Sequence, residues 1–274
     1  MIRRSLLLLI LASTAALASL TRLPAVKHQV AVIAHRGGTG APENTLAAFR
    51  HAIALGVDYI EMDVRVTRDG HLVLMHDPTV DRTTNGKGAV SDLDLAAIRC
   101  LDAGRKCAPR FAGERVPTLD ETLDLCQGQV NVYLDHKDGP VKDIVPALIR
   151  HRMRRHVLVY GGVADLLEWK RVSPSIPVMP SPDGGARAPG GLARFLAILP
   201  AEILDGSVLA WTPDLVREAH SHGALVYTDN LGIADTPAGW RKTIAMGVDG
   251  IQTDYPEKLL AMLAAHPTPT SPSR

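Results

Sequence analysis

The chain has 274 residues, of which 46% are hydrophobic, 22% are charged and 4% are aromatic, and its formal net charge is +1. A charge so close to neutral gives no long-range field that would recruit nucleic acid or an anionic membrane, and so few aromatic side chains argue against a platform for stacked bases. The length and composition suit one large globular domain, such as an α/β barrel of roughly 250 residues.

The first residues have the pattern of a secretory signal peptide. Arg3 and Arg4 form a basic start, residues 5–17 are rich in Leu and Ala, and Ala16-Leu17-Ala18 has the spacing of a cleavage site. We therefore predict that residues 1–18 are a signal peptide and that the protein is exported, to the periplasm or out of the cell, with no stable membrane insertion after cleavage. An uncleaved anchor is the alternative, although the apolar run is short for a span of roughly 20 residues.

Short β-prone runs alternate with longer helical patterns along the rest of the chain, which predicts a parallel sheet with crossover helices. Helical stretches are expected at residues 45–55, 141–153, 213–222 and 240–246. Eight strands are expected, at residues 30–34, 59–64, 130–134, 157–160, 177–179, 208–210, 225–227 and 250–252. The predicted fold is a single (β/α)8 TIM barrel over residues 28–262, followed by a proline-rich, disordered tail at residues 266–274.

One further strand-like segment, residues 72–76, stands outside this set of eight. It follows Asp69-Gly70, a strong signal for a two-residue hairpin loop, so we expect it to fold back antiparallel onto the second strand. In that register Asp63 stands directly opposite His76, and Glu61, two residues earlier, shares the same face. The hairpin extension would thus gather two carboxylates and an imidazole.

Three cysteines, Cys100, Cys107 and Cys126, are present. An exported protein meets an oxidising compartment in which disulfides persist. Cys100 and Cys107 flank a short loop that a disulfide could close, and the odd number leaves one thiol unpaired in a monomer. We expect structural rather than catalytic roles for all three.

Polar residues gather where the predicted strands end, which is the edge at which barrel enzymes carry their catalytic groups. His35 and Arg36 follow the first strand. An imidazole can move protons near neutral pH, and a guanidinium can bind phosphate with two parallel hydrogen bonds. Glu43 follows closely, where it is expected either to orient Arg36 or to lie near a metal.

Three carboxylates are expected at the same edge. Glu61 and Asp63 lie on one face of the second strand, and Asp135 ends the third strand, with Lys137 on the same face two residues later. Like charges so close together need a compensating cation, and hard oxygen ligands favour Ca²⁺ or Mg²⁺ over zinc. His136 points the other way and is expected to be structural.

Two further positions have open interpretations. Asn44 and Thr45 are expected to start a helix, with Asn44 as its cap. Trp211 follows a predicted strand, so it is expected either to wall a substrate pocket or to pack in the core.

Taken in order, these motifs resemble the glycerophosphodiester phosphodiesterase family, whose barrel is of the phosphoinositide-phospholipase-C-like type. The resemblance covers residues 30–258. It is carried by His35-Arg36-Gly37, Pro42-Glu43-Asn44-Thr45, Glu61-x-Asp63-Val64, His76-Asp77, Asp81-Arg82-Thr83-Thr84, Pro117-Thr118-Leu119, Asp135-x-Lys137 and Gly247-Val248-Asp249-Gly250-Ile251-x-Thr253-Asp254.

The resemblance implies a role for each of these site residues. His35 and His76 would be the acid/base pair, and Glu61, Asp63 and Asp135 would hold a divalent cation, Ca²⁺ or Mg²⁺. The residues assigned to the small-molecule substrate are Arg36, Lys137, Glu43, Trp211 and Tyr227. The implied reaction is hydrolysis of a glycerophosphodiester to glycerol 3-phosphate and an alcohol, through a cyclic phosphate formed by the glycerol 2-hydroxyl.

Two positions depart from the family pattern. Asp135 stands where the family usually has Glu, which shortens one metal ligand by a methylene. Tyr227-Thr228-Asp229-Asn230 stands where the family has Trp-Thr-Val-Asn, so Asp229 adds a negative charge near the position of the alcohol head group.

Three other functions compete with this one. A related barrel could cleave lysophospholipids or sphingomyelin, although the sequence shows no obvious exposed apolar loop for a lipid. A non-catalytic phosphoester-binding barrel would not need two proton-transfer groups. A sugar-phosphate isomerase or aldolase could share the fold, but no strand-end Lys or Glu arrangement suggests one.

Overall fold

The computed structural model describes residues 22–188 and 190–265. The predicted signal peptide at residues 1–18 and the predicted tail at residues 266–274 lie outside the described residues, and both stay predictions. Within the described part of the chain, the helices are too short or too polar to cross a bilayer.

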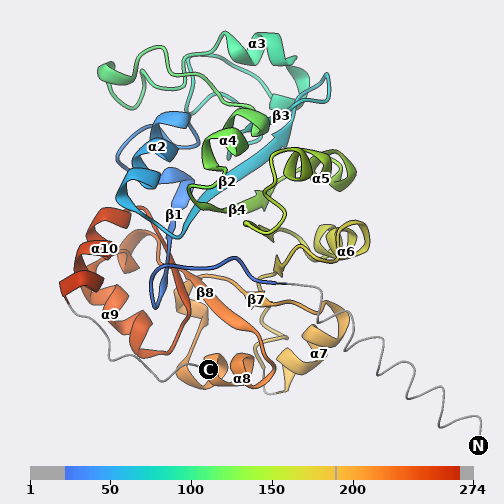
Figure 1. The fold of residues 1–274 in the computed structure, drawn as a ribbon, viewed down its shortest axis with the longest axis vertical. Helices are drawn as coiled ribbons and strands as arrows, with labels where there is room; N and C mark the ends of the chain where they lie inside the picture. The colour runs from blue at the N-terminus through green and yellow to red at the C-terminus, as the bar shows by residue number, and fades with distance from the viewer. Residues whose placement is uncertain (1–21, 189, 266–274) are drawn as a thin grey trace, which may run out of the picture.

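Eight parallel strands form a nearly closed barrel, in the order β6-β5-β4-β2-β1-β9-β8-β7 (Figure 1). Their bounds are β1 Ala31–Ala34, β2 Tyr59–Val66, β4 Asn131–His136, β5 Val157–Tyr160, β6 Val178–Met179, β7 Ile203–Leu204, β8 Leu225–Asp229 and β9 Gly250–Thr253. The two ends of this order meet where the Asp205 backbone N–H donates to the Pro180 carbonyl at 3.0 Å. The predicted (β/α)8 barrel is confirmed.

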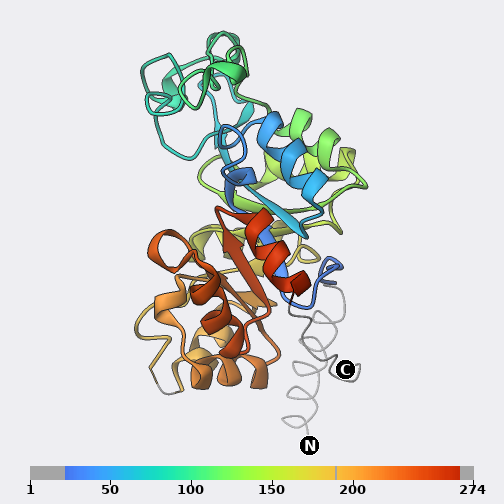
Figure 2. The same ribbon diagram turned by 90° about the vertical axis from the view of Figure 1, so that its left-hand side faces the viewer.

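Helices follow the strands and cover the outside of the barrel (Figures 1 and 2). Several begin at a threonine whose hydroxyl accepts a backbone N–H of the first turn, as Thr45, Thr118 and Thr212 do. The bounds are α2 Leu46–Leu55, α3 Leu95–Arg99, α4 Leu119–Cys126, α5 Val141–Arg150, α6 Val163–Val172, α7 Gly191–Ile198, α8 Pro213–Ser221, α9 Pro237–Ala245 and α10 Pro256–Ala265.

The prediction of the sixth barrel strand, at residues 208–210, was wrong. Residues 208–210 form a 3-10 helix, η4 (Val208–Ala210), whose first turn is capped by the Ser207 hydroxyl. The strand itself is β7, Ile203–Leu204, which pairs in parallel with β8. A short apolar run has no periodicity that separates a strand from a helical turn, and a strand of two residues gives almost no signal.

The expected hairpin register was also wrong, by one residue. β3 (Leu72–Leu74) pairs antiparallel with β2, and Val64 stands opposite Leu74, so Asp63 stands opposite Met75 rather than His76. The loop has three residues, because the Thr67 N–H donates to the His71 carbonyl at 2.9 Å. Gly70 takes the left-handed conformation (φ 85°) at the last loop position, which is the usual form of a three-residue hairpin.

A long excursion between β3 and α4 projects from one end of the molecule (Figures 1 and 2). It contains α3 and packs on a small apolar cluster of its own: Val73, Met75, Val80, Val90, Ile98, Ala103 and Val116. Cys100 and Cys107 are exposed free thiols in this excursion, and Cys126 is a buried free thiol in α4. The disulfide considered for Cys100 and Cys107 is therefore not formed in the structure.

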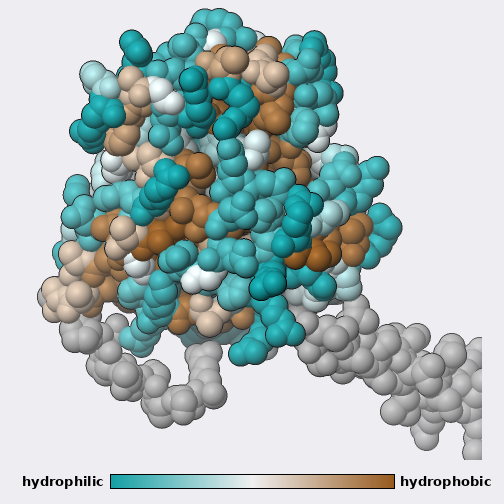
Figure 3. Space-filling view, turned by 45° about the horizontal axis from the view of Figure 1, so that its top comes forward, coloured by the Kyte–Doolittle hydropathy of each residue, from teal (hydrophilic) through white to brown (hydrophobic). Residues whose placement is uncertain are grey.

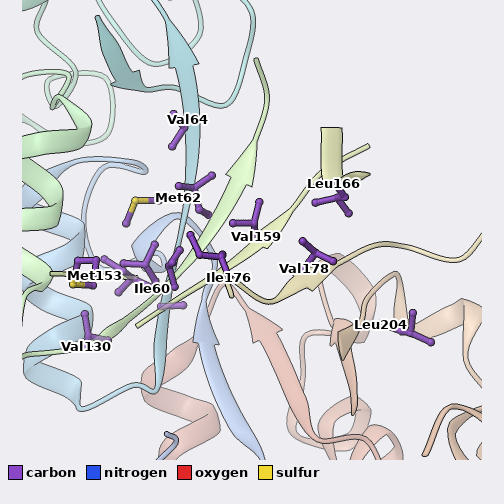
Figure 4. Packing of buried hydrophobic residues seen from close by; sticks show 14 of the residues in the cluster. Ile60, Met62, Val64, Val130, Met153, Val159, Leu166, Ile176, Val178 and Leu204 are labelled. Atoms are coloured by element: carbon purple, nitrogen blue, oxygen red, sulfur yellow. The ribbon is translucent and has the colours of Figure 1, made fainter. Parts of the chain in front are cut away.

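Two apolar layers hold the barrel. The larger lies between the strands and the helices and includes Ile60, Met62, Val159 and Leu166 (Figure 4). The smaller fills the inside of the barrel: Ala31, Ile33, Tyr59, Tyr133, Leu158, Met179, Ile203 and Tyr227. From the side drawn in Figure 3, polar residues cover most of the surface and hydrophobic ones gather in patches across its middle.

Candidate active site

The site lies above the inner apolar layer, at the carboxyl ends of the strands. Side chains alternate between the two faces of a strand, so the inward series of β2 runs from Tyr59 to Glu61 and Asp63. The inward series of β4 runs in the same way from Tyr133 to Asp135. Because β2 and β4 pair in parallel with Asp63 beside Asp135, the three carboxylates meet at one point of the rim.

Glu61, Asp63 and Asp135 can each offer an oxygen within 4.8 Å of the others, and all three residues are buried. Burial raises the pKa of Glu61, and the negative charges of Asp63 and Asp135 raise it further. Burial likewise raises the pKa of Asp135. A divalent cation bound here would stabilise all three ionised forms, so this all-oxygen set fits Ca²⁺ or Mg²⁺.

Two cationic side chains border this acidic trio. Lys137 Nζ lies 3.1 Å from Asp63 Oδ1 and 2.5 Å from Asp135 Oδ2, and Arg36 Nε lies 3.5 Å from Asp63 Oδ2. The Arg36 backbone N–H also donates to Glu61 Oε2 at 2.7 Å. Both cations therefore stand next to the acidic trio, where they can contact an anionic ligand as well.

The turn that carries Arg36 is built into η1 (His35–Gly37), where Arg36 (φ 51°) and Gly37 (φ 89°) both take left-handed conformations. A Cβ on Gly37 would lie 2.7 Å from Ala48 Cβ on α2. The glycine thus lets the turn pack on α2, and the packing fixes the direction of the His35 and Arg36 side chains.

Asn44 does not cap α2, so that expectation was wrong; Thr45 is the cap. Asn44 has φ 54°, and its amide Nδ2 donates to Asp63 Oδ2 at 2.6 Å while its Oδ1 accepts the Asp63 backbone N–H at 3.2 Å. An Asn tolerates this conformation better than most residues do. Asn44 therefore positions one of the three carboxylates.

His35 and His76 line the same pocket as the acidic trio, with a volume of about 210 Å³. His35 Nδ1 lies 2.7 Å from Asp254 Oδ1, and His76 Nδ1 lies 2.8 Å from Asp77 Oδ1. An ionised carboxylate can only accept, so each Nδ1 carries the proton and each Nε2 is left for the ligand. The hairpin register is not what brings His76 here, because β3 ends at Leu74 and His76 lies past the paired residues.

Arg82 connects Glu43, which bonds to Arg36, with Asp77, which bonds to His76. Its guanidinium donates to Glu43 at 2.6 and 2.8 Å and to Asp77 at 2.7 and 3.0 Å. Glu43 Oε1 in turn accepts from Arg36 at 3.0 Å. Glu43 thus orients Arg36, which is one of the two roles considered for it, and the hydrogen bonds from Arg82 and His76 keep the pKa of Asp77 well below its ordinary value.

Two predicted substrate contacts lie elsewhere. Trp211 is 4% exposed and packs in the apolar layer outside the barrel. Tyr227 is 3% exposed and packs its ring edge-on against Tyr59, with centroids 6.0 Å apart, inside the barrel and below the site. Large aromatic side chains at these positions fill the core, so the structure gives neither one a place in the pocket. His136 is structural as expected, since its Nε2 bonds to the Gly139 carbonyl and its Nδ1 accepts from Trp169.

Four pocket residues were not predicted from the sequence: Tyr133, Tyr160, Leu231 and Gln252 line the pocket beside the expected residues. Asp229, which was expected near the alcohol head group, lines it too. The inward alternation of strands could have found three of them, because Tyr160 and Gln252 follow the inward Leu158 and Gly250 by two positions and Tyr133 precedes the inward Asp135 by two. A second, wider pocket of about 450 Å³ shares His35 and Arg36 and is lined by Arg82 and Lys106.

The barrel and the chemistry at its mouth define this protein as an enzyme that hydrolyses phosphate diesters. A model of the glycerophosphoryl diester phosphodiesterase family matches residues 35–258. The chain belongs to that family.

Curated relatives and solved structures agree. A glycerophosphodiester phosphodiesterase from Caldanaerobacter subterraneus subsp. tengcongensis is 35% identical over 241 residues, which cover 85% of this chain and 97% of the relative. A Bacillus subtilis protein of the same name is 31% identical over 84% of this chain and 85% of its own. Among solved structures, a phosphodiesterase from Oleispira antarctica, in complex with the product sn-glycerol-3-phosphate, is 26% identical with a TM-score of 0.78 and covers 87% of this chain and 97% of that one.

Proposed function

We propose that this chain hydrolyses glycerophosphodiesters to glycerol 3-phosphate and an alcohol, with His35 and His76 as the acid/base pair. The observation that carries the proposal is that both imidazoles line one pocket with three clustered carboxylates and two cations. The Oleispira phosphodiesterase, whose structure holds sn-glycerol-3-phosphate, supports the identity of the product.

In the proposed reaction, some residues at the rim bind the phosphate and others transfer protons. Arg36 and Lys137 bind the phosphate and offset its charge. One histidine takes the proton of the glycerol 2-hydroxyl, whose oxygen forms a bond to phosphorus, while the other gives a proton to the alcohol oxygen as its bond to phosphorus breaks. Water then opens the cyclic phosphate with the two roles exchanged. Asp254 and Asp77 hold the two rings in the tautomer that this exchange requires.

Glu61, Asp63 and Asp135 would hold a divalent cation, and we propose Ca²⁺ or Mg²⁺ on the basis of their oxygen donors. Such a cation polarises a phosphoryl oxygen when it is bound. Asp63 Oδ1 is buried and accepts no hydrogen bond of good geometry within the described part of the chain, although Lys137 pairs with it, so a coordination position is available there.

The test is release of glycerol 3-phosphate from glycerophosphocholine, compared with the His35→Ala and His76→Ala variants. The wild type is expected to release it and each variant to be slower by two to four decades. Release by both variants at the wild-type rate would overturn the two-histidine proposal. Phosphoester bound by the wild type without turnover would favour the non-catalytic binding barrel.

A lysophospholipid is a second candidate substrate, because the structure does show exposed apolar residues at this edge. Leu209 in η4 is 79% exposed and Ile233 in η5 (Gly232–Ala234) is 92% exposed. They lie in the loops after β7 and β8, on the same side of the barrel as the pocket. The expectation that no apolar loop is exposed was therefore wrong. Faster turnover of a long-chain lysophosphatidylcholine than of glycerophosphocholine, lost in a Leu209→Ser, Ile233→Ser double variant, would favour this candidate.

We also propose that the protein is exported, on the pattern of residues 1–18. The test expresses the full chain in a bacterium and sequences the N-terminus of the mature protein. Recovery of a chain that begins near residue 19 outside the cytoplasm is expected. A full-length chain retained in the membrane or cytoplasm would overturn this proposal.

A further inference from the structure

The pocket also holds polar residues outside the acidic trio. Asp229 ends β8 and Gln252 lies in β9, and the same pocket is lined by Tyr133 of β4 and Tyr160 of β5, whose ring centroids are 5.9 Å apart. Asp229 also belongs to one of the two departures from the family pattern, Tyr227-Thr228-Asp229-Asn230. The reaction proposed above assigns no role to any of these four residues.

Asp229 and Gln252 offer more hydrogen-bond acceptor oxygens than the neighbouring residues supply donors for. Asp229 Oδ1 accepts from Gln252 Nε2 at 2.5 Å. Within residues 22–188 and 190–265, Asp229 Oδ2 accepts no hydrogen bond, and Gln252 Oε1 is buried with no partner. Gln252 is 6% exposed, and leaving a buried carbonyl oxygen unpaired is costly unless a ligand or water supplies the donor.

A second carboxylate lies one layer deeper. Asp205 follows β7 and is 1% exposed; its Oδ2 accepts from the Tyr133 hydroxyl at 3.1 Å, and its Oδ1 has no partner in the described chain. The two carboxylates lie on adjoining segments, because the Asp229 backbone N–H donates to the Gly206 carbonyl at 3.0 Å. Burial raises the pKa of Asp205, and the charge of Asp229 raises it further. Neither forms an ion pair with any described side chain, and Arg187, beside Gly206, does not reach ion-pair distance of either.

The two sides of the pocket therefore differ in what they attract. On the side of β1, β2 and β4, Arg36, Lys137 and the two imidazoles suit the phosphate. On the side of β7, β8 and β9, the half-buried Asp229 carboxylate, the buried Asp205 carboxylate and the unpaired Gln252 amide oxygen suit a group that carries positive charge and donates hydrogen bonds. Aromatic rings such as those of Tyr133 and Tyr160 also attract ammonium groups.

We propose that Asp229, with Gln252 and Asp205, forms a head-group subsite that selects glycerophosphodiesters whose alcohol carries an ammonium group. This inference rests on the proposed glycerophosphodiester hydrolysis and adds the class of alcohol. Asp229 and Gln252 contact the ammonium group directly, and Asp205 contributes its charge from the layer below.

The test compares kcat/KM for two substrates of similar size, glycerophosphoethanolamine, whose head group is charged, and glycerophosphoglycerol, whose head group is neutral. Asp229→Asn removes the charge at almost constant volume. We expect it to lower kcat/KM for the ethanolamine ester by roughly tenfold to a hundredfold, the range for losing a charged hydrogen bond, and for the glycerol ester by less than about threefold. Asp229→Glu, which keeps the charge, should retain a preference for the ethanolamine ester.

Asp214→Asn is the matched control, because the Asp214 side chain is 88% exposed on α8 and lines neither of the two pockets that share His35 and Arg36. It should leave both rates unchanged. Thermal melts of all variants confirm that they are folded.

Three outcomes would overturn the inference. An equal loss on both substrates would mean that Asp229 acts on His35 or Lys137 instead of on the head group. No loss on either substrate would mean that Asp229 does not contact the substrate. A wild type that releases no glycerol 3-phosphate from either ester would overturn the proposed function together with the subsite. A wild type that is active on both esters, with variants that show either of the first two outcomes, would overturn the subsite alone.

Discussion

Replacing Asn44 by Ala tests whether a buried amide holds the acidic trio in place. The change removes one hydrogen bond to the Asp63 carboxylate, worth about 1.5–3 kcal/mol, and one to the Asp63 backbone N–H, worth about 0.5–1.5 kcal/mol. It also puts an alanine in a left-handed conformation, which adds about 1 kcal/mol. Together these losses should lower the free energy of unfolding by about 3–5 kcal/mol.

For a domain of this size, that loss corresponds to a fall of about 6–20 °C in melting temperature. The same substitution should weaken Ca²⁺ or Mg²⁺ binding by about 10–100-fold, because the hydrogen bond from Asn44 orients Asp63, a proposed ligand of the cation. Thermal unfolding followed by circular dichroism and cation titration followed by calorimetry measure the two effects.

Asn131→Ala is the matched control. Asn131 is also a buried asparagine, but it bonds to the Ala25 carbonyl and to His156 at the opposite end of the barrel. It should lower stability by about 1–2 kcal/mol and leave cation affinity unchanged. If Asn44→Ala melted and bound cations as the wild type does, the role assigned to Asn44 would be refuted.

The remaining predictions concern the pocket and the long excursion. His35→Ala and His76→Ala should each leave the cation affinity within about threefold of wild type while kcat falls by two to four decades, and a loss of the cation instead would contradict a proton-transfer role. Arg82→Ala should lower kcat by up to about a hundredfold, because Glu43 and Asp77 would no longer be held where they orient Arg36 and His76. Unchanged kinetics would show that this orientation does not contribute to turnover. Asp102 has its pKa lowered to about 2 by backbone N–H groups, first that of Arg105, so it stabilises the fold above its unfolded-state pKa and this contribution is lost as the pH falls toward 2. The melting temperatures of wild type and Asp102→Asn should therefore converge between about pH 4 and pH 2, and a constant difference would refute the linkage.

The barrel could be predicted because its strands and helices alternate with clear signals. Long strands such as β2 and β4 carry both an apolar core series and the polar residues that follow it, so the sequence alone placed Glu61, Asp63, Asp135 and Lys137 at one rim. His35 and Arg36 followed from their position after β1.

The errors came from features that depend on tertiary contacts. The two residues of β7 have no pattern of their own, and misplacing that strand at residues 208–210 hid Asp205, which faces inward directly after the true strand. The hairpin register depended on whether Gly70 occupied the second or the third loop position, which the dipeptide Asp69-Gly70 does not decide.

Side-chain roles that depend on distant partners were hardest to predict. Asn44 looked like a helix cap because it precedes α2, yet its amide turns to Asp63, which is 19 residues away in sequence. Trp211 was open between a pocket wall and the core, and Tyr227 was assigned to the substrate from the family motif, whereas the packing of the neighbouring strands and helices buries both. Asp254 pairs with His35 across 219 residues, a contact that only the closing of the barrel creates.

Phosphorus NMR of glycerophosphocholine turnover by cation-loaded, chelated and reloaded protein tests the central claim most directly. Conversion to glycerol 3-phosphate is expected with the loaded protein, should stop after exhaustive chelation, and should return when Ca²⁺ or Mg²⁺ is added back. Turnover that continues unchanged in the chelated sample would contradict a cation held by Glu61, Asp63 and Asp135 beside the two histidines.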